Sequence, residues 1–196
     1  MNFLAHCALA DSAPGILVGG FLGDFVKGPV PAGLPDDVRL GVRLHRRLDA
    51  YSAVEPNIKR SVLRLPPDAR RLAPVFIDLV TDHFLARTFE QWHGEPLAQF
   101  TTRAYRTLQA HDAVLTDAAN RFLRFASERD LFSTYSELEP IERAFGRICR
   151  RLERVDLVGI CMTGLEADYA AFRADFEDYY PALQSHADAW LARQAP

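Results

Sequence analysis

The long segment from Ala73 to Trp92 carries apolar side chains around most of the circumference that a helix would present. It has no glycine, and its single proline falls in the first turn, where a helix tolerates proline. A helix that is apolar nearly all round is a buried helix. This one nevertheless carries Asp78, Asp82 and His83. Because a buried carboxylate is costly unless it is paired or bound to a metal, the segment predicts partners for these groups.

The polar side chains of this segment fall on two neighbouring directions of the helix. Asp78 and Asp82 are four residues apart and therefore share one face. His83 lies about 100° round the axis from Asp82, so a metal ion between the two directions could contact both side chains. For Asp78 a structural alternative is open, because Arg70 and Arg71 precede the helix and either could form an ion pair with it.

Two short helices are predicted before a loop rich in proline and glycine. They cover residues 2–10 and 16–27, and the second contains Gly19, Gly20 and Gly23. Glycine disfavours a helix by propensity. We therefore interpret these three positions as places where another backbone or a ligand comes close.

The next predicted helix begins with Asp36 as its N-cap and runs to about residue 54. Leucines at four-residue spacing form its core stripe. His45 and Asp49 form a second stripe about 100° round the axis, at the edge of the buried face. They could face inward as ligands, or they could be an intrahelical pair on a solvent-exposed face.

The second half of the chain has the mixed charge and apolar spacing of ordinary amphipathic helices. Helices are predicted near residues 96–110, 112–127, 135–152 and 164–194. Pro140 is expected in a first turn, and Pro181 at a kink or break. No strand-like alternation, repeat or linker is present. We therefore predict one all-α domain over residues 1–196, a single-domain helical bundle.

Composition is that of an ordinary soluble protein, with 196 residues, 48% of them hydrophobic and 25% charged. The formal net charge of −3 gives no basic signature for nucleic acid. Cys7, Cys149 and Cys161 are odd in number and far apart, which argues against a disulfide framework or a zinc–cysteine site. The N-terminus does not resemble a signal peptide, and no apolar run of about 18 residues occurs. We expect no membrane partner and a cytoplasmic location; the oligomeric state is unknown.

Seven ionisable side chains fall in apolar helical segments and could face the interior. They are His6, Asp24, His45, Asp49, Asp78, Asp82 and His83. Imidazole and carboxylate ligands suit Mn²⁺, Fe²⁺, Mg²⁺ or Zn²⁺, and the lack of thiolates argues against a structural zinc. The set therefore predicts a site for one or two divalent ions. The structural alternatives are a core histidine at position 6 that bonds a backbone carbonyl and a turn-forming aspartate at position 24.

A cationic face is predicted on the helix that starts at Asp36. The cations on or near it are Arg39, Arg43, Arg46, Arg47, Lys27, Arg70 and Arg71. The common use of such charges is a solvated face. The functional interpretation is a docking patch for a phosphate or an acidic partner, which would be distinctive in a chain of net negative charge.

Five ordered motifs resemble those of the acyl carrier protein phosphodiesterase family. They are MNFLAH at 1–6, GDFVKG at 23–28, LHRRLDAY at 44–51, RRLAPVFIDLVTDHFLARTF at 70–89 and DYYP at 178–181. The resemblance is dense over the first half of the chain and thin after Trp92. It implies a metal-dependent hydrolase, similar to a rearranged HD-type phosphohydrolase, that removes 4′-phosphopantetheine from the serine of holo-acyl carrier protein. The order Asp82–His83 departs from the His-Asp order of HD-type enzymes.

The resemblance also implies a cofactor, a partner and site residues. The family favours Mn²⁺, with Mg²⁺ or Fe²⁺ as possible substitutes, and its partner is the acidic acyl carrier protein. Metal ligands are expected among His6, Asp24, His45, Asp78, Asp82 and His83. Catalytic roles are expected for Asp24, His45, Asp82 and Asp49, the last as an orienter of His45 or a further acid. The residues expected to bind the phosphate or the carrier are Lys27, Arg46 and Arg47.

Two other functions stay open on the sequence. The same metal set would serve a phosphohydrolase of a nucleotide or another small phosphoester. A non-catalytic helical binding protein, whose acids and histidines are simply buried pairs, predicts no bound divalent metal. The buried central helix with its acids makes this last alternative the weakest of the three.

Overall fold

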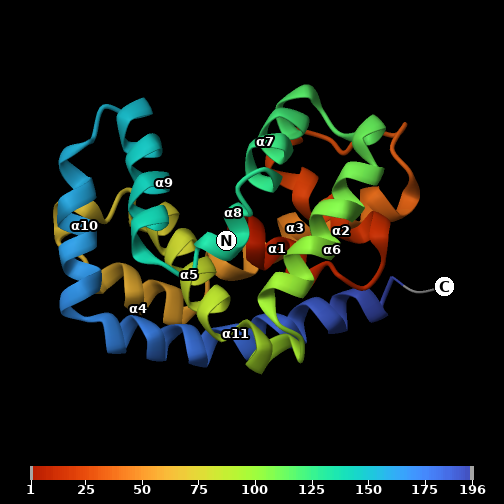
Figure 1. Ribbon diagram of the computed structural model, residues 1–196. Coiled ribbons are helices and arrows are strands. Elements are labelled where there is room, and N and C mark those ends of the chain that lie inside the picture. The colour runs from red at the N-terminus through yellow and green to blue at the C-terminus, as the bar shows by residue number, and fades with distance from the viewer. Residues whose placement is uncertain (1, 195–196) are drawn as a thin grey trace.

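The computed structural model describes residues 2–194, and these form eleven α-helices, three short 3₁₀ helices and no strand (Figure 1). The α-helices are α1 (Phe3–Leu9), α2 (Pro14–Leu22), α3 (Asp36–Ser52), α4 (Pro56–Arg64), α5 (Ala73–His93), α6 (Leu97–Ala110), α7 (Asp117–Ser127), α8 (Leu131–Thr134), α9 (Leu138–Arg151), α10 (Asp156–Ala167) and α11 (Tyr169–Ala192). The 3₁₀ helices are η1 (Gly23–Phe25), η2 (Pro67–Ala69) and η3 (Asp112–Val114). The prediction of an all-α fold is therefore confirmed. Met1, the first residue of the first motif, lies outside the described residues.

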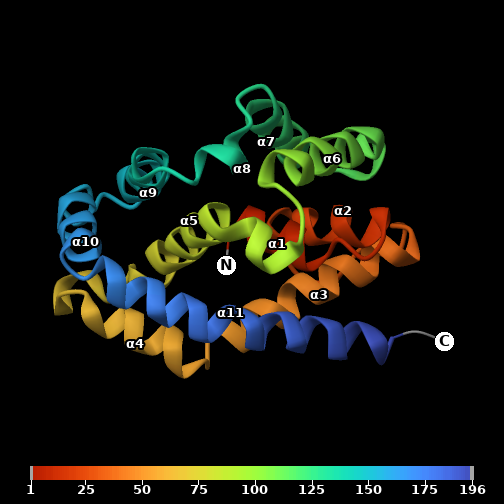
Figure 2. The ribbon, with the colours of Figure 1, turned by 60° about the horizontal axis from the view of Figure 1, so that its bottom comes forward.

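Helix α5 crosses the middle of the molecule and contacts elements from both halves of the chain. Helices α1, α4, α9 and α11 all pack against it. Helix α11 runs along one side of the molecule, beside α4 at one end and α3 at the other (Figures 1 and 2). The α9–α10 hairpin stands at one end of the molecule and α6 and α7 at the other, with α1 between them (Figure 1). Within residues 2–194, none of the helices has the length and hydropathy that a membrane span requires.

The prediction of a buried central helix is confirmed by α5, in which twelve of 21 residues are buried. Pro74 lies in its first turn, as expected. The helix bends at Thr88, whose φ of −124° is not helical. The Thr88 hydroxyl donates to the carbonyl oxygen of Phe84 at 2.7 Å and accepts from Nε1 of Trp92 at 2.9 Å, which stabilises the bend. Gly94 then ends the helix in the left-handed conformation, with φ of 69°.

Helices α2 and α3 approach closely because glycines lie where they cross. A Cβ on Gly19 would stand 2.1 Å from the carbonyl oxygen of Val38, and one on Gly41 would meet the α2 backbone at the same distance, 2.1 Å. Gly20 faces α1, where a Cβ would lie 2.9 Å from the carbonyl oxygen of His6. The interpretation of these glycines as positions of close backbone approach is confirmed. Helices α1, α2 and α3 are thereby held together.

A buried ion network fastens α11 to α4. Asp175 exposes 3% of its side chain and accepts hydrogen bonds from Nε of Arg60 at 2.5 Å, Nε of Arg64 at 2.7 Å and Oγ of Ser61 at 2.9 Å. Burial raises the pKa of the Asp175 carboxyl, but these hydrogen bonds outweigh burial and leave the pKa below its usual value.

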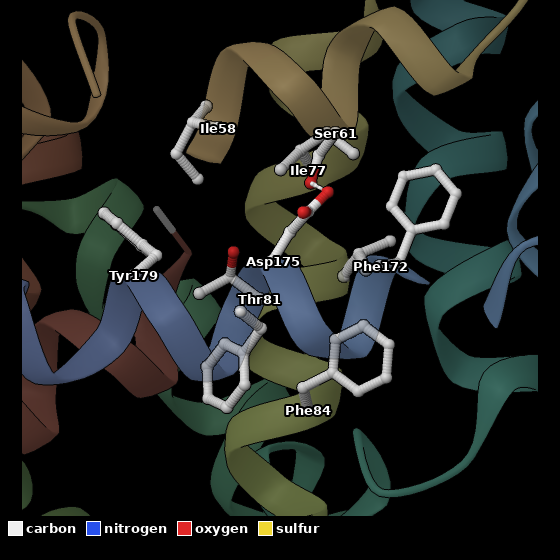
Figure 3. Close-up of a pocket in the computed structure, with 10 residues that line it drawn as sticks. Ile58, Ser61, Ile77, Thr81, Phe84, Phe172, Asp175 and Tyr179 are labelled. Carbon is white, nitrogen blue, oxygen red and sulfur yellow. Dashed lines mark hydrogen bonds between the residues drawn. The ribbon is translucent and has the colours of Figure 1, made fainter. Parts of the chain in front are cut away.

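Figure 3 shows Asp175 and Ser61 facing each other beside apolar side chains. The pocket there holds about 10 Å³, room for no more than about one water, so it is no substrate site.

Three features of the helices differ from the prediction. Pro35, and not Asp36, stands at the N-cap of α3, and the Asp36 carboxylate forms an ion pair within the first turn. The predicted helix over residues 164–194 is two helices that separate at Asp168, where φ of −118° and ψ of 23° leave the helical range. Pro181 lies inside α11 without breaking it. Tertiary packing holds the helix there, through the buried side chains of Tyr179, Tyr180 and Leu183.

Candidate metal centre and adjoining cleft

His45 is held in one orientation by the backbone of α2. Its Nδ1 lies 2.8 Å from the carbonyl oxygen of Gly20. Because a carbonyl only accepts, Nδ1 carries the proton, and the neutral ring keeps a lone pair on Nε2. That Nε2 lies 3.3 Å from Oδ2 of Asp49 and 3.7 Å from Oδ1 of Asp24. A nitrogen lone pair repels carboxylate oxygens, so a proton or a metal ion is required between Nε2 and the two carboxylates. Gly23 leaves room for the ring, since a Cβ there would stand 2.2 Å from it.

His6 on α1 stacks against His45. It is 1% exposed, and the two ring centroids are 3.6 Å apart with their planes inclined by 18°. Its Nε2 lies 3.1 Å from Oδ1 of Asp49, yet neither ring nitrogen makes a well-directed hydrogen bond within residues 2–194. Burial and the neighbouring His45 lower the pKa of His6 to about 3, so this imidazole is neutral near pH 7. Neutral imidazole is the form that binds a metal ion.

Asp49 on α3 supplies the carboxylate of the group. Burial raises its pKa, but the adjacent imidazoles of His45 and His6 outweigh burial and hold the pKa well below the usual value. One ligand atom each from His6, His45 and Asp49 lies within 4.8 Å of the others. Ligands bound at about 2.1 Å to one ion lie about 3 to 3.5 Å apart, so small side-chain movements would bring this donor set onto a single divalent ion. The structure therefore contains a possible His–His–Asp metal site.

Asp82 lies in another environment. It is fully buried on α5, where Oδ2 accepts the backbone N–H of Leu4 at 2.9 Å and Oδ1 accepts that of Ala5 at 2.9 Å. These amides belong to the first turn of α1 and have no hydrogen-bond partner within the helix, so Asp82 caps α1 from a distant part of the chain. Burial raises the pKa of Asp82 to about 7, against the opposing effect of the two amides. Since α1 carries His6, Asp82 sets the position of that imidazole.

His83 is also fully buried, and the structure does not bring it to the His6 group. Its Nδ1 lies 2.9 Å from the carbonyl oxygen of Tyr135, and its Nε2 lies 2.7 Å from the hydroxyl of Tyr169. Both ring nitrogens therefore have hydrogen-bond partners, one in the core and one on the partly buried Tyr169. His83 therefore stabilises the packing around α5, and its side chain leaves the helix in a different direction from that of Asp82.

A cleft of about 720 Å³ adjoins the metal group. Its apolar lining comprises Phe3, Phe25, Val75, Leu79, Phe122, Ala144 and Ile148. Its polar lining comprises Asn2, Asp24, Lys27, Asp78, Tyr135, Arg147 and Arg151. The volume is that of a site for a small ligand or a flexible arm. Because Asp24 lines the cleft and also lies 3.7 Å from Nε2 of His45, the cleft opens beside the metal group.

Of the predicted acids, Asp24 and Asp78 line this cleft. Burial raises the pKa of Asp24, although His45 opposes this effect. Asp78 was predicted either as a ligand or as a partner of the arginines before α5. Arg70 donates instead to the carbonyl oxygens of Leu65 and Leu63, at 3.2 and 3.3 Å.

The three cations predicted to bind the phosphate or the carrier lie in different places. Lys27 lines the cleft. Arg46 donates to the carbonyl oxygen of Val26 at 2.9 Å and so holds the segment that follows η1. Arg47 donates to Nε2 of His186 at 3.2 Å, on the side of α11. Neither arginine lines the cleft within the described residues.

Two cleft residues on α9, Arg147 and Arg151, have no role in the sequence-based prediction. They are four residues apart on an amphipathic helix, a spacing that also describes a solvated helix face. Only the packing of α9 against α5 shows which side of α9 faces the cleft. No signal in the sequence alone distinguishes these two arginines from their neighbours.

Comparison with known proteins gives a consistent result. Residues 1–183 match the family model described as acyl carrier protein phosphodiesterase. An acyl carrier protein phosphodiesterase of Enterobacter sp. (strain 638) is 34% identical over 192 residues, which cover 95% of this chain and 97% of the relative. One of Escherichia coli O6:K15:H31 is 32% identical over 192 residues, with the same coverage of 95% and 97%. No solved structure matches the chain.

Proposed function

The chain belongs to the acyl carrier protein phosphodiesterase family, and we propose on this basis that it removes the 4′-phosphopantetheine group from the serine of holo-acyl carrier protein. In this hydrolysis water adds to phosphorus, the bond from phosphorus to the serine oxygen breaks, and that oxygen takes up a proton. The products are apo-acyl carrier protein and 4′-phosphopantetheine. The observation that carries the proposal is the His6–His45–Asp49 group beside a cleft large enough for the prosthetic arm.

We propose Mn²⁺ as the cofactor, with Mg²⁺ or Fe²⁺ as substitutes. Two imidazoles and a carboxylate suit Mn²⁺ and Fe²⁺, and Asp24 is the nearest further carboxylate to His45, at 3.7 Å. A divalent ion in this position would lower the pKa of water and neutralise charge on the phosphate. The two buried ring nitrogens of His6 support this assignment, because neither has a well-directed hydrogen-bond partner in the described residues.

The three acids receive separate roles in this proposal. Asp49 completes the donor set, with its carboxylate oxygens 3.1 Å from Nε2 of His6 and 3.3 Å from Nε2 of His45. Asp24 borders both the metal group and the cleft, and from there it would pass a proton to the leaving serine oxygen. Asp82 is a positioning residue, because its two hydrogen bonds fix α1 and therefore His6.

The test follows the mass of the carrier. Purified protein is incubated with holo-acyl carrier protein and Mn²⁺, with and without a chelator, and the carrier is weighed by mass spectrometry. The proposal predicts loss of the phosphopantetheine mass only when free metal is present. An unchanged carrier in the presence of Mn²⁺ would overturn it. A panel of nucleotides and small phosphoesters, assayed in parallel, tests the broader phosphohydrolase alternative.

A further inference from the structure

We infer that Arg147 and Arg151 on α9, together with Lys27 after η1, dock the acidic surface of the carrier protein beside the cleft. The inference rests on the proposed function and adds the surface that receives the protein part of the substrate. Lys27 is far from the two arginines in the sequence, yet all three cations line the cleft that Asp24 also lines. A carrier docked there would have its prosthetic arm directed toward the metal group.

The side chains of these three residues are exposed and available to an external partner. Within residues 2–194 none of them forms a hydrogen bond or an ion pair. Arg147 has a single ring contact, with its guanidinium carbon 5.8 Å from the ring centroid of Phe125. By contrast, Arg143 on the same helix pairs with Glu139, and Arg154 just beyond it pairs with Asp156 at 3.0 Å.

The alternative cationic surface on α3 is less suitable for docking. Arg46 is occupied by the carbonyl oxygen of Val26, and Arg47 by His186. Binding of either arginine to a partner would break a hydrogen bond that links α3 to another segment of the chain. The cations of the cleft can instead bind carboxylates without breaking any such contact in the described residues.

Charge and exposed apolar area both favour an acidic protein as the occupant. The whole chain carries a formal net charge of −3, so an acidic partner is attracted only by a local cationic surface. Arg147, Arg151 and Lys27 supply that surface. Just after Arg151, the side chains of Leu152 and Val155 are 46% and 60% exposed. Apolar residues next to arginine are typical of protein–protein interfaces and are not needed to bind a free phosphate.

Charge reversal at the cleft arginines tests the inference. The test variant is Arg147→Glu/Arg151→Glu, and the matched control is Arg121→Glu/Arg124→Glu on α7, two exposed arginines that do not line the cleft, so the net charge changes equally. Binding of immobilised holo-acyl carrier protein is measured by biolayer interferometry at low and high salt, and KM and kcat are measured in parallel. Mn²⁺ affinity and thermal unfolding confirm that each variant is folded and retains its metal site.

The inference predicts that the test variant binds the carrier at least about tenfold more weakly at low salt, whereas the control binds like wild type. The KM of the test variant should rise far more than its kcat falls, and its affinity should lose most of its dependence on salt. Equal weakening in both variants, or in neither, would overturn the docking surface. A wild-type protein that binds the carrier without hydrolysing it refutes the proposed function, and the two variants still decide the docking surface. A wild-type protein that does not bind the carrier refutes the docking inference.

Discussion

The Nδ1 of His45 donates its proton to the carbonyl oxygen of Gly20 at 2.8 Å, and this contact turns Nε2 toward Asp49 and Asp24. A hydrogen bond on one ring nitrogen fixes the tautomer and the orientation of the other, as it does for histidines that ligate metals. Helix α2 therefore contributes to the metal group without supplying a ligand from its own side chains.

Replacing Gly23 with alanine should weaken metal binding although no ligand is removed. The new Cβ would stand 2.2 Å from the His45 ring, so the ring must rotate away from its present direction. We expect the affinity for Mn²⁺ to fall by about tenfold or more, measured by isothermal titration calorimetry. Gly33→Ala is the matched control, because no atom lies within 4 Å of a Cβ at that position. Wild-type affinity in the Gly23→Ala variant would show that the ring orientation does not matter.

Asp82→Ala should destabilise the fold before it affects any chemistry. The substitution leaves the buried N–H groups of Leu4 and Ala5 without their acceptor. We expect the free energy of unfolding to fall by about 3 kcal/mol in metal-free protein, measured by urea denaturation. Wild-type stability together with complete loss of Mn²⁺ binding would instead identify Asp82 as a direct ligand.

His83→Gln should lower stability and spare the metal. Both ring nitrogens of His83 form hydrogen bonds, with the carbonyl oxygen of Tyr135 and the hydroxyl of Tyr169, so its loss removes hydrogen bonds worth about 1 kcal/mol each. The affinity for Mn²⁺ should stay within about twofold of wild type, whereas His45→Gln should abolish most of it. A His83→Gln variant that loses its metal would restore His83 to the ligand set.

Asp175→Asn should reduce stability in a pH-dependent way. The pKa of Asp175 is lowered in the folded protein, so its stabilisation is fully present above the unfolded pKa of about 3.9 and is lost as the pH falls through the folded pKa. We expect a deficit of about 2 kcal/mol at pH 7, reduced from the full value for a buried pair because Arg60 is half exposed. Below about pH 3 the deficit should shrink.

The control for that experiment is Asp178→Asn. Asp178 also pairs with Arg60, at 3.0 Å, but its side chain is 64% exposed. Exposed pairs contribute about 0.2 to 1 kcal/mol, so this variant should remain close to wild type at every pH. Chemical denaturation of the three proteins at several pH values measures both effects. Equal deficits in the two variants would mean that burial of Asp175 adds nothing.

Helical periodicity was sufficient to predict the all-α fold, because the apolar spacing that makes a helix is local. The buried helix α5 and the close approach at the glycines of α2 are predictable for the same reason, because each can be read from the residues of its own segment. The break at Asp168 and the unbroken α11 at Pro181 were not predicted, because tertiary packing decides both.

The candidate site was only partly predictable, for a reason that Asp82 illustrates. Periodicity indicated that this acid lies in the interior, but not that the amides of Leu4 and Ala5, more than seventy positions away, satisfy it. The same spacing argument that selected His45 and Asp49 also selected His83, because it cannot identify the partner across the core. Which side of α9 faces the cleft likewise depends on tertiary packing, so Arg151 had no distinguishing signal.

The central claim is that His6, His45 and Asp49 hold the ion required for removal of phosphopantetheine. The most direct measurement weighs holo-acyl carrier protein by mass spectrometry after incubation with Mn²⁺ and either wild type, His45→Gln or the matched His83→Gln. The account predicts conversion to the apo mass by wild type and by His83→Gln, and an unchanged carrier with His45→Gln. Conversion by His45→Gln at the wild-type rate would contradict the account.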